Sequence, residues 1–295
     1  MISTVDDVTR GLEANRYLAD EGLATAVFLA MTLPRPLLLE GDAGVGKTEV
    51  AKAIARWTGG RLLRLQCYEG IDVAQAVYEW DYARQLLHLR AMEAGGHEVV
   101  EDEVYSERFL VRRPLLQAID HHGDVPPVLL VDEVDRADDE FEAFLLEILS
   151  DFEVTVPELG TFRTDIPPIV VLTSNRTRDV HDALKRRCLY HWIAHPSFER
   201  ELAILRVRAP GVPEQLAAQV AAAVAVLRDL ELYKPPGVAE TIDWAEALAA
   251  LGHRVLDEEA VRTTLGTILK YREDQERVAE HGLPAILQAA AAQHG

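Results

Sequence analysis

The chain has 295 residues, of which 48% are hydrophobic and 27% are charged, a composition typical of a globular protein with one or two domains. It carries 49 Asp and Glu against 30 Lys and Arg, a formal net charge of −19 at pH 7. Phosphate backbones are bound through Lys and Arg, so this charge argues against a nucleic-acid partner, and its simplest interpretation is solubility.

No stretch of the sequence has the pattern of a spanning helix or a signal peptide. The apolar stretch 23–39 is broken by Pro34, Arg35 and Pro36, and the first ten residues carry acids but no apolar core. Cys67 and Cys188 lie far apart in the sequence, without metal-ligand spacing, and are interpreted as buried, reduced thiols. We therefore expect a cytoplasmic protein without obligate membrane insertion.

Up to about residue 195, short apolar runs alternate with longer helical patterns, which predicts an α/β domain with a parallel sheet and crossover helices. The predicted strands are short and apolar throughout, as strands buried on both faces should be. They comprise residues 36–40, 61–66, 128–132, 169–173 and 190–194. This pattern predicts a five-stranded parallel sheet within a domain at 1–195.

Two other regions depart from this alternation. Residues 152–156 alternate apolar and polar side chains, 157–160 can form a turn, and 161–164 can return, which predicts a β-hairpin near 152–164, with a surface loop as the alternative. After Pro196 the sequence is rich in Ala and Leu with no strand pattern. It predicts a small all-helical domain at 196–295.

A phosphate-binding loop follows the first predicted strand and precedes a predicted helix. Its glycines let backbone N–H groups wrap around phosphates, and the helix N-terminus adds a partial positive charge. In this pattern Lys47 reaches the outer phosphates of ATP and the hydroxyl of Thr48 holds Mg²⁺. The complete motif is Gly41, Asp42, Ala43, Gly44, Val45, Gly46, Lys47 and Thr48.

The third and fourth predicted strands both end in polar residues. Asp132 and Glu133 end one strand at the sheet edge where ligands bind, so Asp132 is predicted to hold Mg²⁺ and Glu133 to activate the attacking water. An acidic helix start is the alternative interpretation. Asn175 follows the other strand and either positions the same water or belongs to a turn.

Arg186 and Arg187 stand just before the last predicted strand. Charge develops on the γ-phosphate in the transition state, and an arginine supplied from outside the site can stabilise it. A solvated helix end is the alternative interpretation of this pair.

These motifs in this order resemble the AAA+ ATPases, and the resemblance covers essentially the whole chain. The hairpin, followed by residues 164–168, is similar to the MoxR branch of that family. Within this branch the chain is most similar to the accessory ATPases that mature carbon monoxide dehydrogenase, the CoxD-like group. The stretches that carry this narrower resemblance are 65–70, 78–82, 185–188 and 235–244.

The resemblance implies an AAA+ P-loop core with a helical lid, assembled into a ring, expected to be a hexamer, with ATP between subunits. It makes Asn175 the sensor 1 residue and places the arginine finger at Arg186 or Arg187, with Arg186 preferred by its position in the Leu-x-Arg pattern. It also implies a partner with a von Willebrand factor A domain and a molybdenum-containing dehydrogenase as the client for metalloenzyme maturation.

The chain departs from many AAA+ proteins because residues 237–244 contain no sensor 2 arginine; Thr241 lies near the expected place and Lys234 is the nearest cation. Two other functions share the same nucleotide chemistry: a nucleic-acid motor or loader, and a nucleotide-gated scaffold with little turnover. The acidic balance argues against the first, and Glu133 argues against the second.

Overall fold

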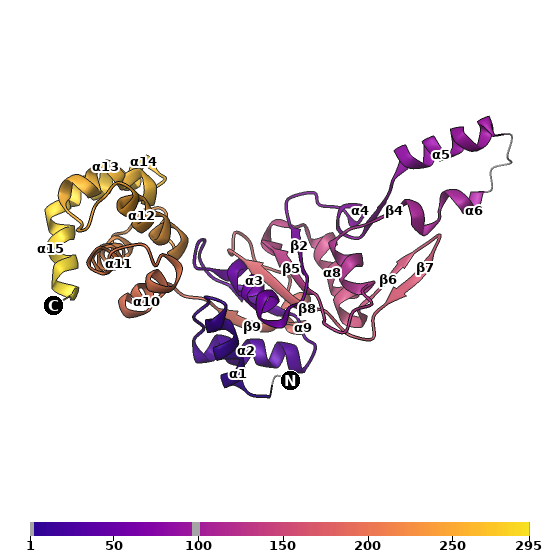
Figure 1. Ribbon diagram of the computed structural model, residues 1–295, viewed down its shortest axis with the longest axis horizontal. Coiled ribbons are helices and arrows are strands. Elements are labelled where there is room, and N and C mark those ends of the chain that lie inside the picture. The colour runs from indigo at the N-terminus through magenta and orange to yellow at the C-terminus, as the bar shows by residue number, and fades with distance from the viewer. Residues whose placement is uncertain (1–2, 96–100, 295) are drawn as a thin grey trace. The chain divides into compact units, whose positions relative to one another are not determined.

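The computed structural model describes residues 3–95 and 101–294, and its chain divides into two compact units (Figure 1). The first unit comprises Met1–Asn15, Ala19–Glu40 and Thr48–Trp192. The second comprises Arg16–Leu18, Gly41–Lys47 and Ile193–Gly295. The predicted phosphate loop is therefore grouped with the C-terminal helices, and a domain boundary at residue 195 remains a prediction.

The first unit contains the predicted five-stranded sheet, in the order β2-β5-β8-β1-β9 with every neighbouring pair parallel. The strands are β1 (Leu37–Glu40), β2 (Leu62–Gln66), β5 (Val128–Asp132), β8 (Ile169–Ser174) and β9 (Leu189–Trp192). Every residue of β1, β5 and β8 is buried, which explains why these strands appear in the sequence as continuous apolar runs. Their carboxyl ends lie side by side because the strands are parallel and adjacent.

Helices and two short 3₁₀ turns lie before and between these strands along the chain. They are α1 (Val5–Ala14), α2 (Glu21–Thr32), α3 (Lys47–Thr58), α4 (Val73–Ala76), α5 (Tyr82–Ala94), α6 (Glu101–Val104), η1 (Glu107–Phe109), α7 (Pro114–Ile119), η2 (Val134–Arg136), α8 (Asp139–Asp151) and α9 (Asp182–Arg187). Helix α2 packs against β1, β8 and β9, and α7 packs against β2 and β5. Asp138 fixes the start of α8, since its carboxylate accepts a hydrogen bond from the backbone N–H of Phe141 at 2.8 Å.

Two antiparallel hairpins extend the first unit. The predicted hairpin is present as β6 (Glu153–Val156) and β7 (Gly160–Arg163), with Val154 and Val156 buried as the alternation requires. A second hairpin, β3 (Tyr78–Trp80) and β4 (Leu110–Arg112), was not predicted from the sequence. It carries α5 and α6 between its strands, and Figure 1 shows this insertion extending away from the five-stranded sheet.

The C-terminal part of the second unit is helical, as predicted, and residues 193–294 contain no strand. Its helices are α10 (Phe198–Arg208), α11 (Glu214–Asp229), α12 (Val238–Ala250), α13 (Glu258–Ile268), α14 (Arg272–His281) and α15 (Leu283–His294). The core is centred on α11 and on Trp244, which is fully buried and donates a hydrogen bond from Nε1 to Thr264 Oγ1 at 2.7 Å. Within the described ranges, no helix is long and apolar enough to cross a membrane.

Candidate active site

The predicted phosphate loop joins the end of β1 to the start of α3, the context that the sequence indicates. Gly44 and Gly46 have φ angles of +81° and +98°, in a region that side chains disfavour, so glycine is required at both positions. Lys47 is nearly buried, and its Nζ donates hydrogen bonds to the carbonyl oxygens of Gly41 and Asp42, both at 2.7 Å. The ammonium group therefore lies over the loop that precedes it.

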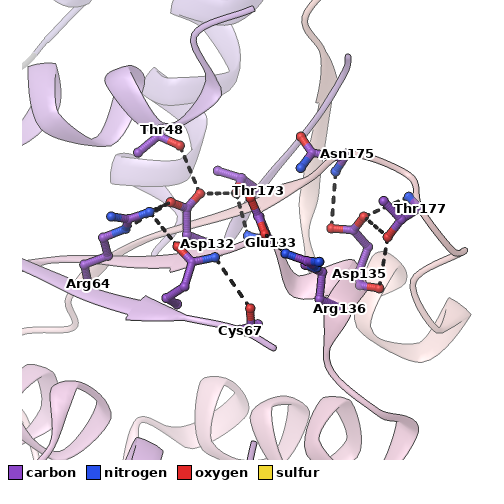
Figure 2. Close-up of polar contacts among 11 residues, drawn as sticks. Thr48, Arg64, Cys67, Asp132, Glu133, Asp135, Arg136, Thr173, Asn175 and Thr177 are labelled. Carbon is purple, nitrogen blue, oxygen red and sulfur yellow. Dashed lines mark hydrogen bonds and ion pairs between the residues drawn. The ribbon is translucent and has the colours of Figure 1, made fainter. Parts of the chain in front are cut away.

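Asp132, at the end of β5, is the centre of a buried hydrogen-bond cluster (Figure 2). Its Oδ1 accepts from Thr48 Oγ1 at 3.0 Å and from Thr173 Oγ1 at 2.5 Å. Its Oδ2 accepts from Arg64 Nε at 3.0 Å and from Arg64 Nη2 at 2.5 Å. Mg²⁺ prefers oxygen ligands, so the paired hydroxyl of Thr48 and carboxylate of Asp132 fit that ion.

Glu133 has a left-handed backbone conformation, with φ 56° and ψ 50°. Such a conformation costs a residue other than glycine about 1–2 kcal/mol, and the hydrogen bond from the Glu133 backbone N–H to Thr173 Oγ1, at 2.9 Å, helps to hold it. Thr173 thus contacts both the carboxylate of Asp132 and the backbone of Glu133. The Glu133 carboxylate is partly exposed, and its ion pair with Arg136, at 3.1 Å, is of the weak i,i+3 surface type. Its side chain can therefore reorient at little cost.

Asp135 connects the turn after β5 to the turn after β8. It is 1% exposed, and its carboxylate accepts hydrogen bonds from the backbone N–H of Asn175 at 3.2 Å and of Thr177 at 2.8 Å. The Thr177 hydroxyl donates a third, at 2.7 Å. Figure 2 shows the two turns joined by these bonds, so the backbone of Asn175 is fixed to the segment that carries Glu133.

Arg186 and Arg187 end helix α9, and both are exposed. Arg187 Nη1 donates a hydrogen bond to Ser150 Oγ at 2.7 Å, whereas the Arg186 side chain has no hydrogen bond or ion pair within the described ranges. Arg35 Nη2 donates to the backbone carbonyls of both arginines at 3.0 Å, which fixes the end of the helix. Neither guanidinium is bonded to Asp132 or Glu133, so the structure does not bring the arginines into the cluster of acids.

The phosphate loop contacts the start of α12 at the place where many AAA+ proteins have a sensor 2 arginine. The backbone N–H of Ala239 donates to the Gly44 carbonyl at 3.2 Å, and a Cβ added to Gly237 would lie 2.7 Å from Gly44 Cα. A side chain at position 237 therefore has no room. Thr241 is fully buried and donates to Glu201 Oε1 at 2.7 Å, so its hydroxyl is engaged within the helical unit.

An arginine from α11 with a largely buried side chain lies beside this threonine. Arg228 Nη2 donates to Glu201 Oε1 at 2.8 Å, and Arg228 Nε donates to the carbonyl of Pro236 at 2.8 Å. Lys234, the nearest cation in the sequence, is exposed, and its backbone N–H donates to Asp274 Oδ2 at 3.1 Å. Arg228 fixes the turn before α12, a role that its place in an Ala-rich helical pattern does not indicate.

Three residues of the site were missed from the sequence. Arg64 is the charged residue in the middle of the apolar strand β2, a signal that could have marked it. Asp135 stands two residues after Glu133 in an acidic stretch, where nothing in the sequence separates it from the other acids. Thr173 is the last residue of the predicted strand 169–173, but threonine is an ordinary strand residue, so its polar side chain alone does not mark this role.

Comparison with known proteins gives a family for the sheet-containing region. Residues 36–188 match the model of the AAA domain, dynein-related subfamily. Midasin of Dictyostelium discoideum is 30% identical over an alignment of 115 residues. The match covers 35% of this chain and 2% of midasin, so the chain corresponds to a small part of that protein.

Two solved structures share 15% sequence identity with the chain. A candidate ATPase from Cytophaga hutchinsonii matches 98% of this chain and 93% of its own, with a TM-score of 0.49. The Holliday junction branch migration motor RuvB of Thermotoga maritima matches 83% of this chain and 66% of its own, with a TM-score of 0.47.

Proposed function

We propose that this chain, which belongs to the AAA domain family of the dynein-related subfamily, couples ATP hydrolysis to the remodelling of a protein partner. The chain is an ATPase that uses ATP with Mg²⁺, as membership of this family entails. The observation that carries the site assignment is the 3.0 Å hydrogen bond between Thr48 and Asp132, which joins the residue after the phosphate-loop lysine to the acid at the end of β5.

Each residue in this proposal has one role. Lys47 and the backbone N–H groups of the loop bind the phosphates, and Thr48 and Asp132 hold the metal ion. When bound, Mg²⁺ neutralises charge on the β- and γ-phosphates. Glu133 accepts a proton from the attacking water, and its partly exposed, weakly paired carboxylate supports that role. Asn175 orients the same water, a role supported by its attachment to Asp135.

We assign the arginine finger to Arg186, acting on ATP held by a neighbouring subunit of a ring. The support is that Arg186 is exposed and unbonded among the described residues, whereas Arg187 is bonded to Ser150. Arg186→Ala subunits mixed with wild-type subunits should reduce the ATPase rate more steeply than dilution alone, because each variant subunit disables its neighbour's site. Arg187→Ala is the matched control, and equal poisoning by both variants, or by Arg187→Ala alone, would contradict the assignment.

The proposed biological role is that of a MoxR-type chaperone, expected as a hexamer, that matures a metalloenzyme. The support is the resemblance of residues 65–70, 78–82, 185–188 and 235–244 to the CoxD-like ATPases. The client is then a molybdenum-containing dehydrogenase, and a protein with a von Willebrand factor A domain is the partner. A cytoplasmic location belongs to this proposal, since the free thiols of Cys67 and Cys188 are the form that persists in a reducing compartment.

A trap experiment tests this role. Glu133→Gln should bind ATP but hydrolyse it far more slowly, which keeps the assembled ring on its client during a pull-down. Glu140→Gln, an exposed change on α8, is the matched control for the loss of one acid. Enrichment of a von Willebrand factor A protein or a molybdenum dehydrogenase over the control is the expected result. Recovery of DNA or replication proteins in place of both would contradict the proposal.

A further inference from the structure

Glu40 is a buried acid that none of the assigned roles uses. It is the last residue of β1, immediately before the phosphate loop, and it is only 3% exposed. Its Oε2 accepts a hydrogen bond from Tyr190 Oη at 3.1 Å, and its Oε1 accepts no hydrogen bond from any residue in the described ranges. A carboxylate is costly to bury without partners, so the groups around it need an explanation.

Two cations face this carboxylate from separate segments of the chain. Lys185 Nζ lies 3.7 Å from Oε1, and Arg176 Nε lies 3.9 Å from Oε2. Both distances are within ion-pair range but too long for a hydrogen bond. Oε1 of Glu40 therefore has no hydrogen-bond donor in this arrangement of the described residues. Lys185 Nζ would come within hydrogen-bond distance of it if helix α9 moved closer by less than 1 Å.

Both cations adjoin residues with a proposed role in hydrolysis. Arg176 directly follows Asn175, and Lys185 directly precedes Arg186. Arg176 has a left-handed backbone, with φ 55°, and its guanidinium lies 5.8 Å from the ring centre of Trp192. The side chain that faces Glu40 therefore comes from a strained turn, and such turns keep their conformation only where surrounding contacts hold them.

We propose that Glu40 is a positioning residue that couples the strand leading into the phosphate loop to the Asn175 turn and to the arginine end of α9. Its charge attracts Arg176 and Lys185 at the same time, so the placement of Asn175 and Arg186 depends on one buried carboxylate. The inference rests on the proposed function, since it concerns the placement of residues assigned to hydrolysis there.

Glu40→Gln tests the coupling, because glutamine keeps the size of the side chain and an oxygen for Tyr190 but removes the charge. The expected result is a KM for ATP within about twofold of wild type and a kcat lower by about tenfold or more, since small misplacements of catalytic groups have large effects on rate. A purely structural role would instead lower stability and leave the kcat of the folded protein unchanged.

Lys185→Met gives a second test that does not disturb the buried position, since Lys185 is partly exposed. It should lower kcat in the same way, and the Glu40→Gln, Lys185→Met double variant should lose less than the product of the two single losses. Lys270→Met, in the helical unit, is the matched control and should retain wild-type kcat. Multiplicative losses, or a wild-type kcat in both single variants, would overturn the inference.

Assaying Glu133→Gln in parallel distinguishes failure of the Glu40 coupling from failure of the proposed function. If it abolishes turnover while Glu40→Gln and Lys185→Met do not reduce it, the proposed site stands and the coupling by Glu40 is wrong. If Glu133→Gln turns over like wild type, the proposed function and the inference that rests on it both fail.

Discussion

Replacing Asp135 by alanine should affect both the stability of the sheet-containing unit and the rate of hydrolysis. The change removes the carboxylate that accepts hydrogen bonds from the backbone N–H groups of Asn175 and Thr177. Both groups lie in the turn after β8, so this turn loses its attachment to η2. Because none of the roles proposed for binding ATP uses Asp135, binding of ATP should be retained.

The size of the stability effect follows from the number of bonds lost. Hydrogen bonds to a charged group contribute about 1.5–3 kcal/mol each, so losing the two from backbone N–H groups costs about 3 kcal/mol or more. For a unit of this size, 1 kcal/mol corresponds to about 2–4 °C in Tm, which gives a decrease of about 6–12 °C. Asp138→Ala is the matched control, since it removes one exposed helix cap and should cost about 1 kcal/mol.

Thermal unfolding and steady-state ATPase kinetics of Asp135→Ala and Asp138→Ala test this prediction. Asp135→Ala should lower kcat by about tenfold or more at an almost unchanged KM, because Asn175 is no longer held in place. Asp138→Ala should keep the wild-type kcat. A wild-type kcat in Asp135→Ala at a temperature where it is folded would refute the link between Asp135 and the water-positioning turn.

Two further predictions concern buried groups. Burial raises the pKa of both Cys67 and Cys188 from 9.0 to about 12, so neither thiol should react with iodoacetamide at pH 8 until the protein unfolds, as mass spectrometry can show. Since unfolded thiols ionise near pH 9, raising the pH from 9 to 12 should favour the unfolded state, and a stability that rises across this interval would contradict the burial of these thiols. Thr264→Val leaves the Trp244 Nε1–H without its acceptor and should cost the helical unit about 1–3 kcal/mol, measured by denaturant unfolding. Thr263→Val, which removes an exposed hydroxyl, should lower the stability of the helical unit less. Equal losses of stability in the two variants would contradict the energy expected for the hydrogen bond between Trp244 and Thr264.

The sheet could be predicted chiefly because β1, β5 and β8 are buried along their whole length and therefore form continuous apolar runs, whereas β2 and β9 have exposed residues. The hairpin β6–β7 could be predicted for the opposite reason, since only Val154 and Val156 face the core and the polar residues alternate with them. The strands β3 and β4 are three residues long and about 30 residues apart, too short for periodicity to be detected. Their pairing depends instead on tertiary contacts such as the edge-to-face packing of Trp80 and Tyr105.

In the candidate site, residues that belong to local motifs could be predicted, whereas residues that act through contacts distant in the sequence could not. Lys47, Thr48, Asp132 and Glu133 could be predicted because each stands in a motif of adjacent residues. Thr173 acts through a bond to an acid 41 residues earlier in the chain, and nothing next to it in the sequence marks that role. The absence of a sensor 2 arginine was visible in the sequence, whereas the close approach of Gly237 to Gly44 of the phosphate loop could not be predicted from it.

The most direct test of the account compares ATP binding and ATP hydrolysis in Glu133→Gln, Lys47→Ala and the wild-type protein. Glu133→Gln should bind ATP with Mg²⁺ as tightly as wild type and hydrolyse it at least about a hundredfold more slowly, since general-base catalysis contributes about 10²–10⁴-fold. Lys47→Ala should lose nucleotide binding. Wild-type turnover by Glu133→Gln, or unchanged ATP affinity in Lys47→Ala, would contradict the assignment of the site.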